Sequence, residues 1–127
     1  MSHLEIDELN ILNASFLAMH RALDKINTKF DSILVDGNRF KQYYKTQHHC
    51  IIKGDAKYLN IAAASILAKT HRDAIMLKLD LDFPQYYWKK NKGYPTKKHR
   101  DAIREIGTNV NHRMSFKLLP DQLKLDL

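Results

Sequence analysis

Two aspartates in this sequence follow short apolar runs, at the points where β-strands would end. Asp36 follows residues 32–35 and precedes a Gly-Asn dipeptide, and Asp55 follows residues 50–52 and Gly54. Apolar runs bounded by turn residues are typical of strands. Carboxylates held at strand ends suit Mg²⁺ or Mn²⁺, which prefer hard oxygen ligands. The pattern therefore predicts a metal site at Asp36 and Asp55. The alternative is that each aspartate only bonds the backbone of its own turn.

An amphipathic helical segment is predicted ahead of the first strand. Ser2 and Glu5 fit a capping box, and apolar residues recur every three or four positions over residues 6–26. This segment forms either one helix or two that meet near Asn10. In both cases its apolar face needs a partner surface.

The rest of the chain predicts strands alternating with helices. Strands are expected at residues 30–35 and 50–52, a long helix over about residues 58–81, before Pro84, and a shorter helix over residues 96–107. Strands that are joined through helices pair in parallel. The sequence therefore predicts an α/β fold.

The composition favours a small basic protein with a polyanionic partner. Its 127 residues suffice for one domain, and 21 Lys and Arg against 14 Asp and Glu give a formal net charge of +7. Nucleic acid and an anionic membrane surface both fit that charge. No apolar run approaches the roughly 20 residues that span a bilayer, and residues 1–5 do not resemble a signal peptide. A soluble cytoplasmic protein is expected.

The single cysteine, Cys50, excludes a disulfide within the chain, and its apolar neighbours predict a buried side chain rather than a nucleophile.

Several basic and aromatic residues are candidates for contact with such a polyanion. Lys53 stands beside the second aspartate, and Lys69 follows Ser65 by one helical turn, so that Ser65 and Lys69 could reach one phosphate. The alternative is that these lysines only keep the surface soluble. Residues 85–98 combine tyrosines, a tryptophan and lysines, and this segment is the best candidate for a nucleic-acid contact.

Five short motifs stand in an order that is known from one enzyme family. They are LVDGN at residues 34–38, KGD at 53–55, ASILAK at 64–69, KGY at 92–94 and HRMSF at 112–116. With these motifs the chain resembles ribonuclease HII, the enzyme that nicks RNA inside RNA–DNA duplexes. The resemblance extends over nearly the whole chain.

For the fold, the resemblance implies an α/β ribonuclease-H-like architecture of short parallel strands, packed helices and a helical C-terminal region. The family begins with a strand that carries an Asp-Glu pair and with a Gly-Arg-Gly or Gly-Lys-Gly turn, and no such stretch occurs here. The chain is therefore expected to form a single incomplete domain over residues 1–127, similar to the family's C-terminal part without about its first third. Within it, residues 84–127 would form the loop and helix that contact substrate.

For activity, the resemblance implies hydrolysis, with Mg²⁺ or Mn²⁺, of the RNA strand of RNA–DNA hybrids and of duplex DNA at single ribonucleotides. Asp36 and Asp55 fall on two positions of the family's four-carboxylate catalytic and metal site, so the isolated chain is expected to be inactive. Tyr94 corresponds to the tyrosine that packs against the sugar beside the cleaved linkage. His112 and Arg113 correspond to a basic motif that contacts nucleic acid. The complete family protein is expected to be a monomer without a membrane partner.

Two other hypotheses remain open. The chain could be a basic module that binds nucleic acid without cleaving it. It could also be an incomplete fold that exposes the edge of the strand bearing Asp36 and self-associates. The acids of the helical segments, including Asp73, are expected to form solvated faces or local ion pairs rather than metal ligands.

Overall fold

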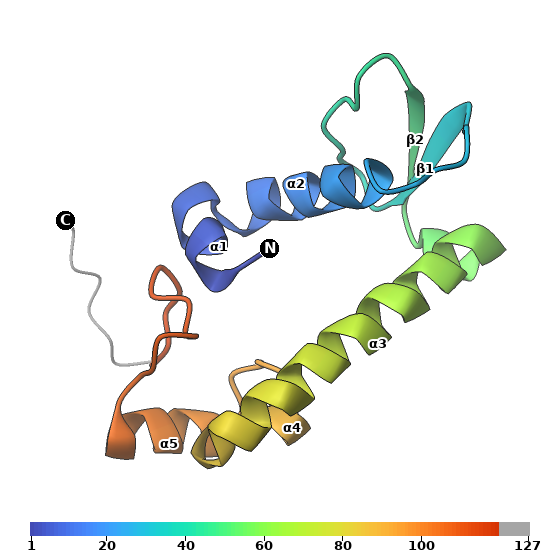
Figure 1. Cartoon of the computed structure of the whole chain (residues 1–127). Helices are drawn as coiled ribbons and strands as arrows, with labels where there is room; N and C mark the ends of the chain where they lie inside the picture. The colour runs from blue at the N-terminus through green and yellow to red at the C-terminus, as the bar shows by residue number, and fades with distance from the viewer. Residues whose placement is uncertain (120–127) are drawn as a thin grey trace.

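The computed structural model of the chain describes residues 1–119 (Figure 1). The helices in this part are α1 (His3–Leu9), α2 (Ile11–Leu23), α3 (Leu59–Asp82), α4 (Trp88–Asn91) and α5 (Lys97–Ile106). The strands are β1 (Ser32–Asp36) and β2 (Gln47–Ile51), and 3₁₀ turns occupy Gly54–Ala56 and Pro84–Tyr86. None of these helices has the length and hydropathy of a membrane-spanning segment. Residues 120–127, the end of the predicted region 84–127, lie outside the described residues.

The N-terminal amphipathic segment is divided into two helices at Asn10. Asn10 has a left-handed φ of 65°, and its side-chain oxygen accepts hydrogen bonds of 3.1 Å from the amides of Leu12 and Asn13. This side chain therefore caps α2 at its start. The capping box of Ser2 and Glu5, predicted from the sequence, is present at the start of α1.

β1 and β2 form a two-stranded parallel sheet in which Asp36 is the partner of Ile51. The predicted parallel pairing is confirmed, although the connection between the strands, residues 37–46, contains no helix. This connection packs on α2 instead, through an edge-to-face contact between the rings of Phe40 and Phe16. The combination of helices and a parallel sheet is compatible with the predicted α/β class.

β2 differs from the strand that the apolar run predicts. It starts at Gln47 and includes His48 and His49, because pairing with β1 rather than local hydrophobicity sets its bounds. Cys50 is exposed, so the prediction of a buried thiol is wrong. The physical reason is that the packing between the sheet and α2 buries Ile33 and Val35 of β1 but does not extend over Cys50.

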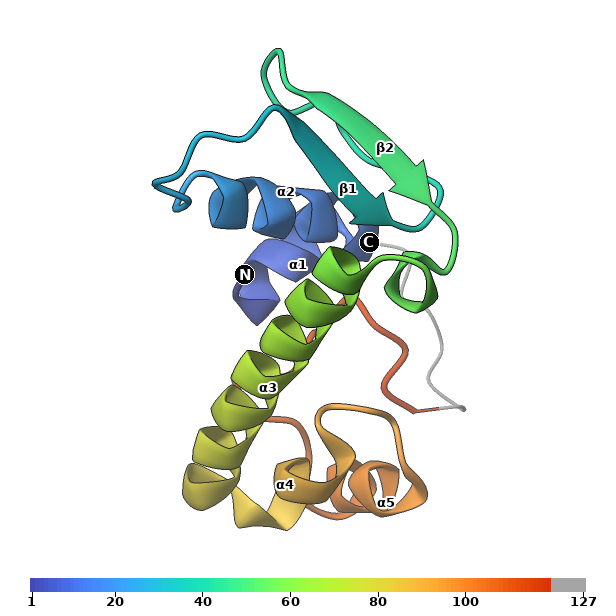
Figure 2. The same cartoon turned by 90° about the vertical axis from the view of Figure 1, so that its right-hand side faces the viewer.

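Two separate hydrophobic clusters form the interior of the described part. The first lies between the sheet and α2, and its buried members are Ile33, Val35 and Tyr43. The second joins the C-terminal half of α3 to α4 and α5, and its buried members are Met76, Tyr86, Trp88, Ala102 and Ile103. As Figure 2 shows, α3 runs from the sheet and α2 to α4 and α5. Between them, Ile66 and Leu67 on α3 expose 61% and 70% of their surface.

The aromatic segment at residues 85–98 contributes its rings to the second cluster. Tyr86 and Trp88 expose only 2% and 3% of their surface, and the hydroxyl of Tyr86 donates a hydrogen bond of 2.9 Å to the carbonyl of Gly107. These two rings are therefore core residues and not nucleic-acid contacts. Lys89 and Lys90 are exposed, so the basic part of the segment remains available to a polyanion.

The segment after α5 returns to the N-terminal helices (Figures 1 and 2). Asp7 on α1 accepts hydrogen bonds from the amide of Met114 at 2.7 Å, and from the amide and hydroxyl of Ser115 at 3.1 and 2.5 Å. Burial of the Asp7 carboxyl raises its pKa. The hydrogen bonds from Ser115 and Met114 outweigh this effect, so the pKa of Asp7 is lowered on balance. We call this contact the Asp7 clasp. It fixes the C-terminal segment to α1.

Candidate active site

Asp36 and Asp55 lie at the same edge of the parallel sheet. Asp36 is the last residue of β1, and the amide that follows it, that of Gly37, donates a 2.9 Å hydrogen bond to the carbonyl of Ile51 at the end of β2. The chain then turns, and the amide of Gly54 donates a hydrogen bond of 2.8 Å to Oδ1 of Asp36. Asp55 follows directly. The structure therefore brings together the two acids that the sequence singled out, and both side chains are exposed.

Gly54 is needed at this turn because of close packing. A Cβ atom there would lie 2.6 Å from Cδ1 of Ile61, in the first turn of α3, and 3.5 Å from Oδ1 of Asp36. Its carbonyl accepts a hydrogen bond of 2.8 Å from the amide of Tyr58, the residue that precedes α3. The same short turn therefore positions the Asp36 carboxylate, presents Asp55 and starts α3.

The donors at this edge suit a hard divalent cation. Two carboxylates supply oxygen ligands, and Mg²⁺ is usually held by one or two protein carboxylates together with waters and substrate phosphates. In residues 1–119 no group of three or more His, Cys, Asp or Glu side chains could hold a metal ion together. Asp36 and Asp55 thus fit a cation that takes its remaining ligands from elsewhere.

A cavity of about 520 Å³ adjoins Asp36 between β1, α2 and the start of α3. Its lining is mostly apolar, but it includes the polar side chains of Asp36, Asn60 and Ser65. Ser65, a predicted phosphate contact, therefore shares this cavity with the predicted metal ligand. Lys69 lies one turn further along α3, and Lys53 immediately precedes Gly54; both lysines are exposed.

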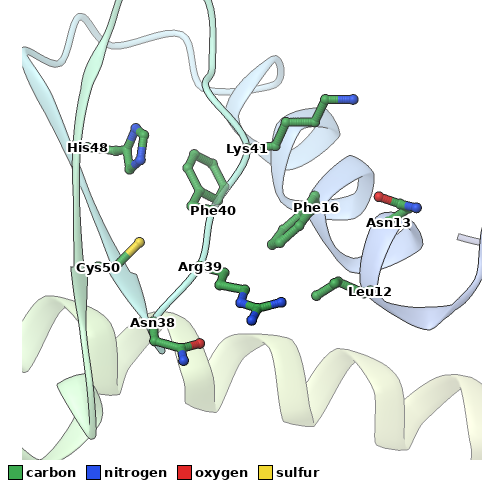
Figure 3. Close-up of a pocket in the computed structure, with 9 residues that line it drawn as sticks. All are labelled: Leu12, Asn13, Phe16, Asn38, Arg39, Phe40, Lys41, His48 and Cys50. Atoms are coloured by element: carbon green, nitrogen blue, oxygen red, sulfur yellow. The ribbon is translucent and has the colours of Figure 1, made fainter.

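A second cavity, of about 580 Å³, lies between α2, the connection after β1, and β2. Figure 3 shows the ring of Phe40 between Phe16 of α2 and His48 of β2, with Cys50 further along the same strand. The lining includes basic side chains, among them Arg39, but no carboxylate. Its donors therefore do not suit Mg²⁺.

Tyr94 lies in a loop that packs on the C-terminal half of α3, away from the acids. This loop contacts Arg72 and Met76, whereas Gly54 contacts Ile61, so the two regions are about 17 Å apart along the helix axis. Tyr94 exposes 69% of its surface. It is therefore accessible to a ligand, but residues 1–119 do not bring it into contact with Asp36.

His112 lies inside the second cluster rather than on the surface. It exposes 5% of its surface, and its ring stacks on that of His99 at 5.3 Å and meets the ring of Tyr86 edge-on at 4.7 Å. Burial, and then the neighbouring His99, lower its pKa. Nε2 of His112 is buried without a hydrogen-bond partner in the described part. In this arrangement the ring supports the fold and does not reach a ligand.

Arg113 is placed differently from its neighbour. Its guanidinium lies over the ring of Phe116, 4.0 Å from the ring centre, which is a cation–π arrangement. Partial burial, and then the positive charge of Arg72, lower its pKa. The nearby negative charge of Asp7 acts in the opposite direction and raises the pKa of Arg113.

The role of Asn91 is not visible in the sequence. Asn91 is buried; its amide nitrogen donates to the carbonyl of Tyr86, and its side-chain oxygen accepts from the amide of Gly93, both at 2.8 Å. Asp73 forms an ion pair, at 4.0 Å from Nζ of Lys92, but the partner lies in the loop after α4 and is not the local partner that was expected. The only local sign of the role of Asn91 is that a polar residue stands directly before KGY. The bond from Asn91 to Tyr86 could not be predicted from the spacing of residues.

Comparisons with known proteins agree on one family. The family model described as Ribonuclease HII matches residues 1–119. The chain is similar to curated ribonucleases HII from Christiangramia forsetii (67% identity over 122 residues), Phocaeicola vulgatus (59% over 123) and Bacteroides thetaiotaomicron (61% over 123). These alignments cover 96%, 97% and 96% of this chain but 62%, 61% and 62% of the relatives. The chain thus spans about three-fifths of the length of these relatives. On this match, and on the resemblance that its motifs carry, the chain belongs to the ribonuclease HII family.

Proposed function

We propose that this chain carries part of a ribonuclease HII active site, in which Asp36 and Asp55 bind a divalent cation, Mg²⁺ or Mn²⁺. The observation that carries the proposal is the 2.8 Å hydrogen bond from Gly54 to Asp36, which holds the two acids at one edge of the sheet. Membership of the family supports it independently. The proposal includes a ribonuclease-H-like fold that is incomplete in this chain.

The proposed reaction is endonucleolytic hydrolysis of the RNA strand of RNA–DNA hybrids and of duplex DNA beside single ribonucleotides, leaving 3′-hydroxyl and 5′-phosphate ends. A bound cation would supply charge stabilisation and a more acidic water molecule. Asp36 would contribute one carboxylate oxygen while the other stays bonded to Gly54, and Asp55 would contribute from the next turn. Because the family site uses four carboxylates, two acids alone are expected to leave the isolated chain inactive.

The substrate contacts in the proposal lie along α3 and in the regions at its two ends. Lys53, Ser65 and Lys69 would contact phosphates close to the acids, since a helical turn separates Ser65 from Lys69. At the far end, Tyr94 would pack against the sugar of the ribonucleotide and Arg113 would contact the backbone. Residues 84–127 would form the C-terminal loop and helix that contact substrate, and residues 120–127 of this region lie outside the described part. The buried ring of His112 would act by supporting this region.

The experiment that tests the proposal is cleavage of a DNA duplex that carries one ribonucleotide, with Mg²⁺ and then with Mn²⁺. The variants Asp36→Asn and Asp55→Asn remove the proposed ligands, and Asp82→Asn removes an exposed acid at the end of α3 as the matched control. No nick by the folded chain is the expected result for two acids alone, and the ligand assignment then depends on Mn²⁺ binding that Asp36→Asn and Asp55→Asn weaken and Asp82→Asn does not. A nick beside the ribonucleotide that only the first two variants abolish would overturn the expected inactivity and keep the ligand assignment. Cleavage that survives both variants would contradict the ligand assignment.

A binding function without hydrolysis is the second candidate, and the net charge of +7 together with only two acids at the site favours it. Binding of RNA–DNA hybrid that falls steeply with salt and does not respond to Mg²⁺, by a folded chain that makes no nick, is the expected result in that case. Binding that requires Mg²⁺ would argue against it.

A further inference from the structure

Arg72 on α3 is bonded to the backbone of the loop that carries Tyr94. Its Nη2 atom donates a hydrogen bond of 3.0 Å to the carbonyl oxygen of Lys92. The bond joins residues 20 positions apart, so it is a tertiary contact between α3 and the Lys92–Tyr94 loop rather than a helix contact. A guanidinium that donates to a neutral carbonyl makes a charge-assisted hydrogen bond.

The next residue of α3 holds the other end of Lys92. Oδ2 of Asp73 lies 4.0 Å from Nζ of Lys92. Two successive residues of one helix thus hold both the backbone and the side chain of the same loop residue. The loop needs such support, because Lys92 has a φ of 51° and Gly93 a φ of 83°, and a lysine in the left-handed region is uncommon.

The Arg72 guanidinium lies directly against the loop backbone. A Cβ atom added to Gly93 would be 3.1 Å from Nη2 of Arg72 and 3.5 Å from Cε of Met76. On the other side of the loop, the amides of Gly93 and Tyr94 donate to the side chain and carbonyl of Asn91, both at 2.8 Å. Between these contacts the loop backbone has little freedom.

The Tyr94 side chain depends on this backbone for its direction. It exposes 69% of its surface, so packing of the ring contributes little to its orientation. What orients the ring is therefore the conformation of residues 92–94, which Arg72 holds from one side and Asn91 from the other.

We propose that Arg72 is a positioning residue, which holds the Lys92–Tyr94 loop against α3 and thereby sets the position of the Tyr94 ring. The link to ribonucleotide recognition rests on the proposed function, in which Tyr94 contacts the sugar. The attachment of the Lys92–Tyr94 loop to Arg72 does not rest on the proposed function. A role for Arg72 as a phosphate contact only would instead weaken binding to every duplex equally and leave the loop unchanged.

The first measurement follows the loop itself, by NMR amide exchange in the chain as given. The variants are Arg72→Ala, Arg72→Lys and, as a control that removes one positive charge from the same helix, Lys78→Ala. We expect Arg72→Ala to speed exchange at Gly93 and Tyr94 by about tenfold, since a lost charge-assisted bond is worth about one decade. Exchange at Ala102 and Ile103 should not change, and Arg72→Lys should restore part of the protection. Unchanged exchange at Gly93 and Tyr94 would overturn the proposal.

The second measurement compares the affinities for an all-DNA duplex and for the same duplex with one ribonucleotide. We expect Arg72→Ala to reduce the preference for the ribonucleotide as much as Tyr94→Ala does, and Lys78→Ala to leave the preference unchanged. A faster-exchanging loop with an intact preference would overturn the role in recognition. If the unmodified chain has no preference, the proposed function fails, and the exchange rates alone still decide whether Arg72 holds the loop.

Discussion

Gly54 donates its backbone hydrogen bond to the side chain of Asp36, across the end of the parallel sheet, at 2.8 Å. This bond commits one carboxylate oxygen to the backbone and leaves the other for a ligand. Because Asp55 follows Gly54 directly, the same bond links the orientation of one acid to the position of the next. The spacing between the two acids therefore depends on how closely the turn at Gly54 approaches β1.

Replacing Gly54 by alanine should disturb this spacing. The added Cβ would lie 2.6 Å from Cδ1 of Ile61, a buried residue, so either the Ile61 side chain or the turn must move. We expect Gly54→Ala to lower the free energy of unfolding by about 1–3 kcal/mol, the usual cost of overpacking. Denaturant unfolding followed by circular dichroism measures it.

The matched control removes the clashing atom. Ile61→Val deletes Cδ1 and by itself should cost about 1 kcal/mol. The double variant Gly54→Ala, Ile61→Val should be more stable than the two single effects added together, because the new methyl group occupies the space that Cδ1 leaves. If the two single effects on the free energy of unfolding simply add, the contact with Ile61 is not the reason for glycine at position 54.

Removal of either carboxylate should weaken cation binding without unfolding the chain. Asp36→Asn keeps an oxygen that can accept the Gly54 hydrogen bond, so only the charge is lost. We expect the affinity for Mn²⁺ to fall by about tenfold or more in Asp36→Asn and in Asp55→Asn, since ligand charge governs such sites. Titration calorimetry measures this, and Asp82→Asn should bind like the unmodified chain.

The second cluster should lose stability in mild acid because of His112. Its pKa is lowered in the folded state, so between the folded value and about 6.5 the unfolded chain binds more protons. The stabilising contribution of the neutral ring is therefore complete above about pH 6.5 and is lost as the pH falls through the folded pKa. Thermal unfolding followed by Trp88 fluorescence should show a midpoint temperature that falls as the pH is lowered from 7.5.

Two variants separate this effect from general acid sensitivity. His112→Phe should flatten the pH dependence, because the ring that titrates is gone while its stacking on His99 is kept. His71→Gln, at an exposed position of α3, should leave the dependence unchanged. A midpoint that varies with pH equally in all three proteins would exclude His112 as the cause.

The Asp7 clasp should be lost in stronger acid. The pKa of Asp7 is lowered on balance in the folded state, so its contribution is complete above about pH 4 and disappears as the pH falls through the folded pKa. At neutral pH we expect Asp7→Ala to cost about 1 kcal/mol, the value of a typical hydrogen bond. A double-mutant cycle with Ser115→Ala measures the coupling, and Glu8→Ala, an exposed acid on the same helix, should change little.

Lys69 should account for about one phosphate contact in the binding of duplex DNA. The slope of the logarithm of the binding constant against the logarithm of salt concentration should become shallower by about 0.9 in Lys69→Ala. Lys29→Ala, which removes an exposed charge between α2 and β1, serves as the comparison. An unchanged slope in Lys69→Ala would remove this lysine from the proposed contacts.

Local signals in the sequence predicted the helix ends well. Thr96 caps α5 and Gly107 ends it, and α3 ends shortly before Pro84, as expected. These features depend on the residues next to them in sequence, which is why the pattern alone was sufficient. The position of Asp36 at the end of β1 was also predicted this way, since turn dipeptides mark where a strand stops, whereas Asp55 lies in the 3₁₀ turn that follows β2.

Tertiary contacts were not accessible in the same way. The exposure of Cys50 follows from which part of the sheet α2 covers, and the burial of Tyr86, Trp88 and His112 follows from how α5 returns to α3. Arg72 and Asp7 bond backbone groups 20 and 107 positions away. No local pattern encodes a partner at that separation.

The Asp7 clasp also influences how quickly the chain folds. It joins positions 107 residues apart, and the entropy needed to close a loop grows with its length, while long-range contacts slow folding in general. During synthesis α1 is made long before its partner segment, which is among the last described residues to be added. α1 can therefore form the Asp7 clasp only after Ser115 has been added.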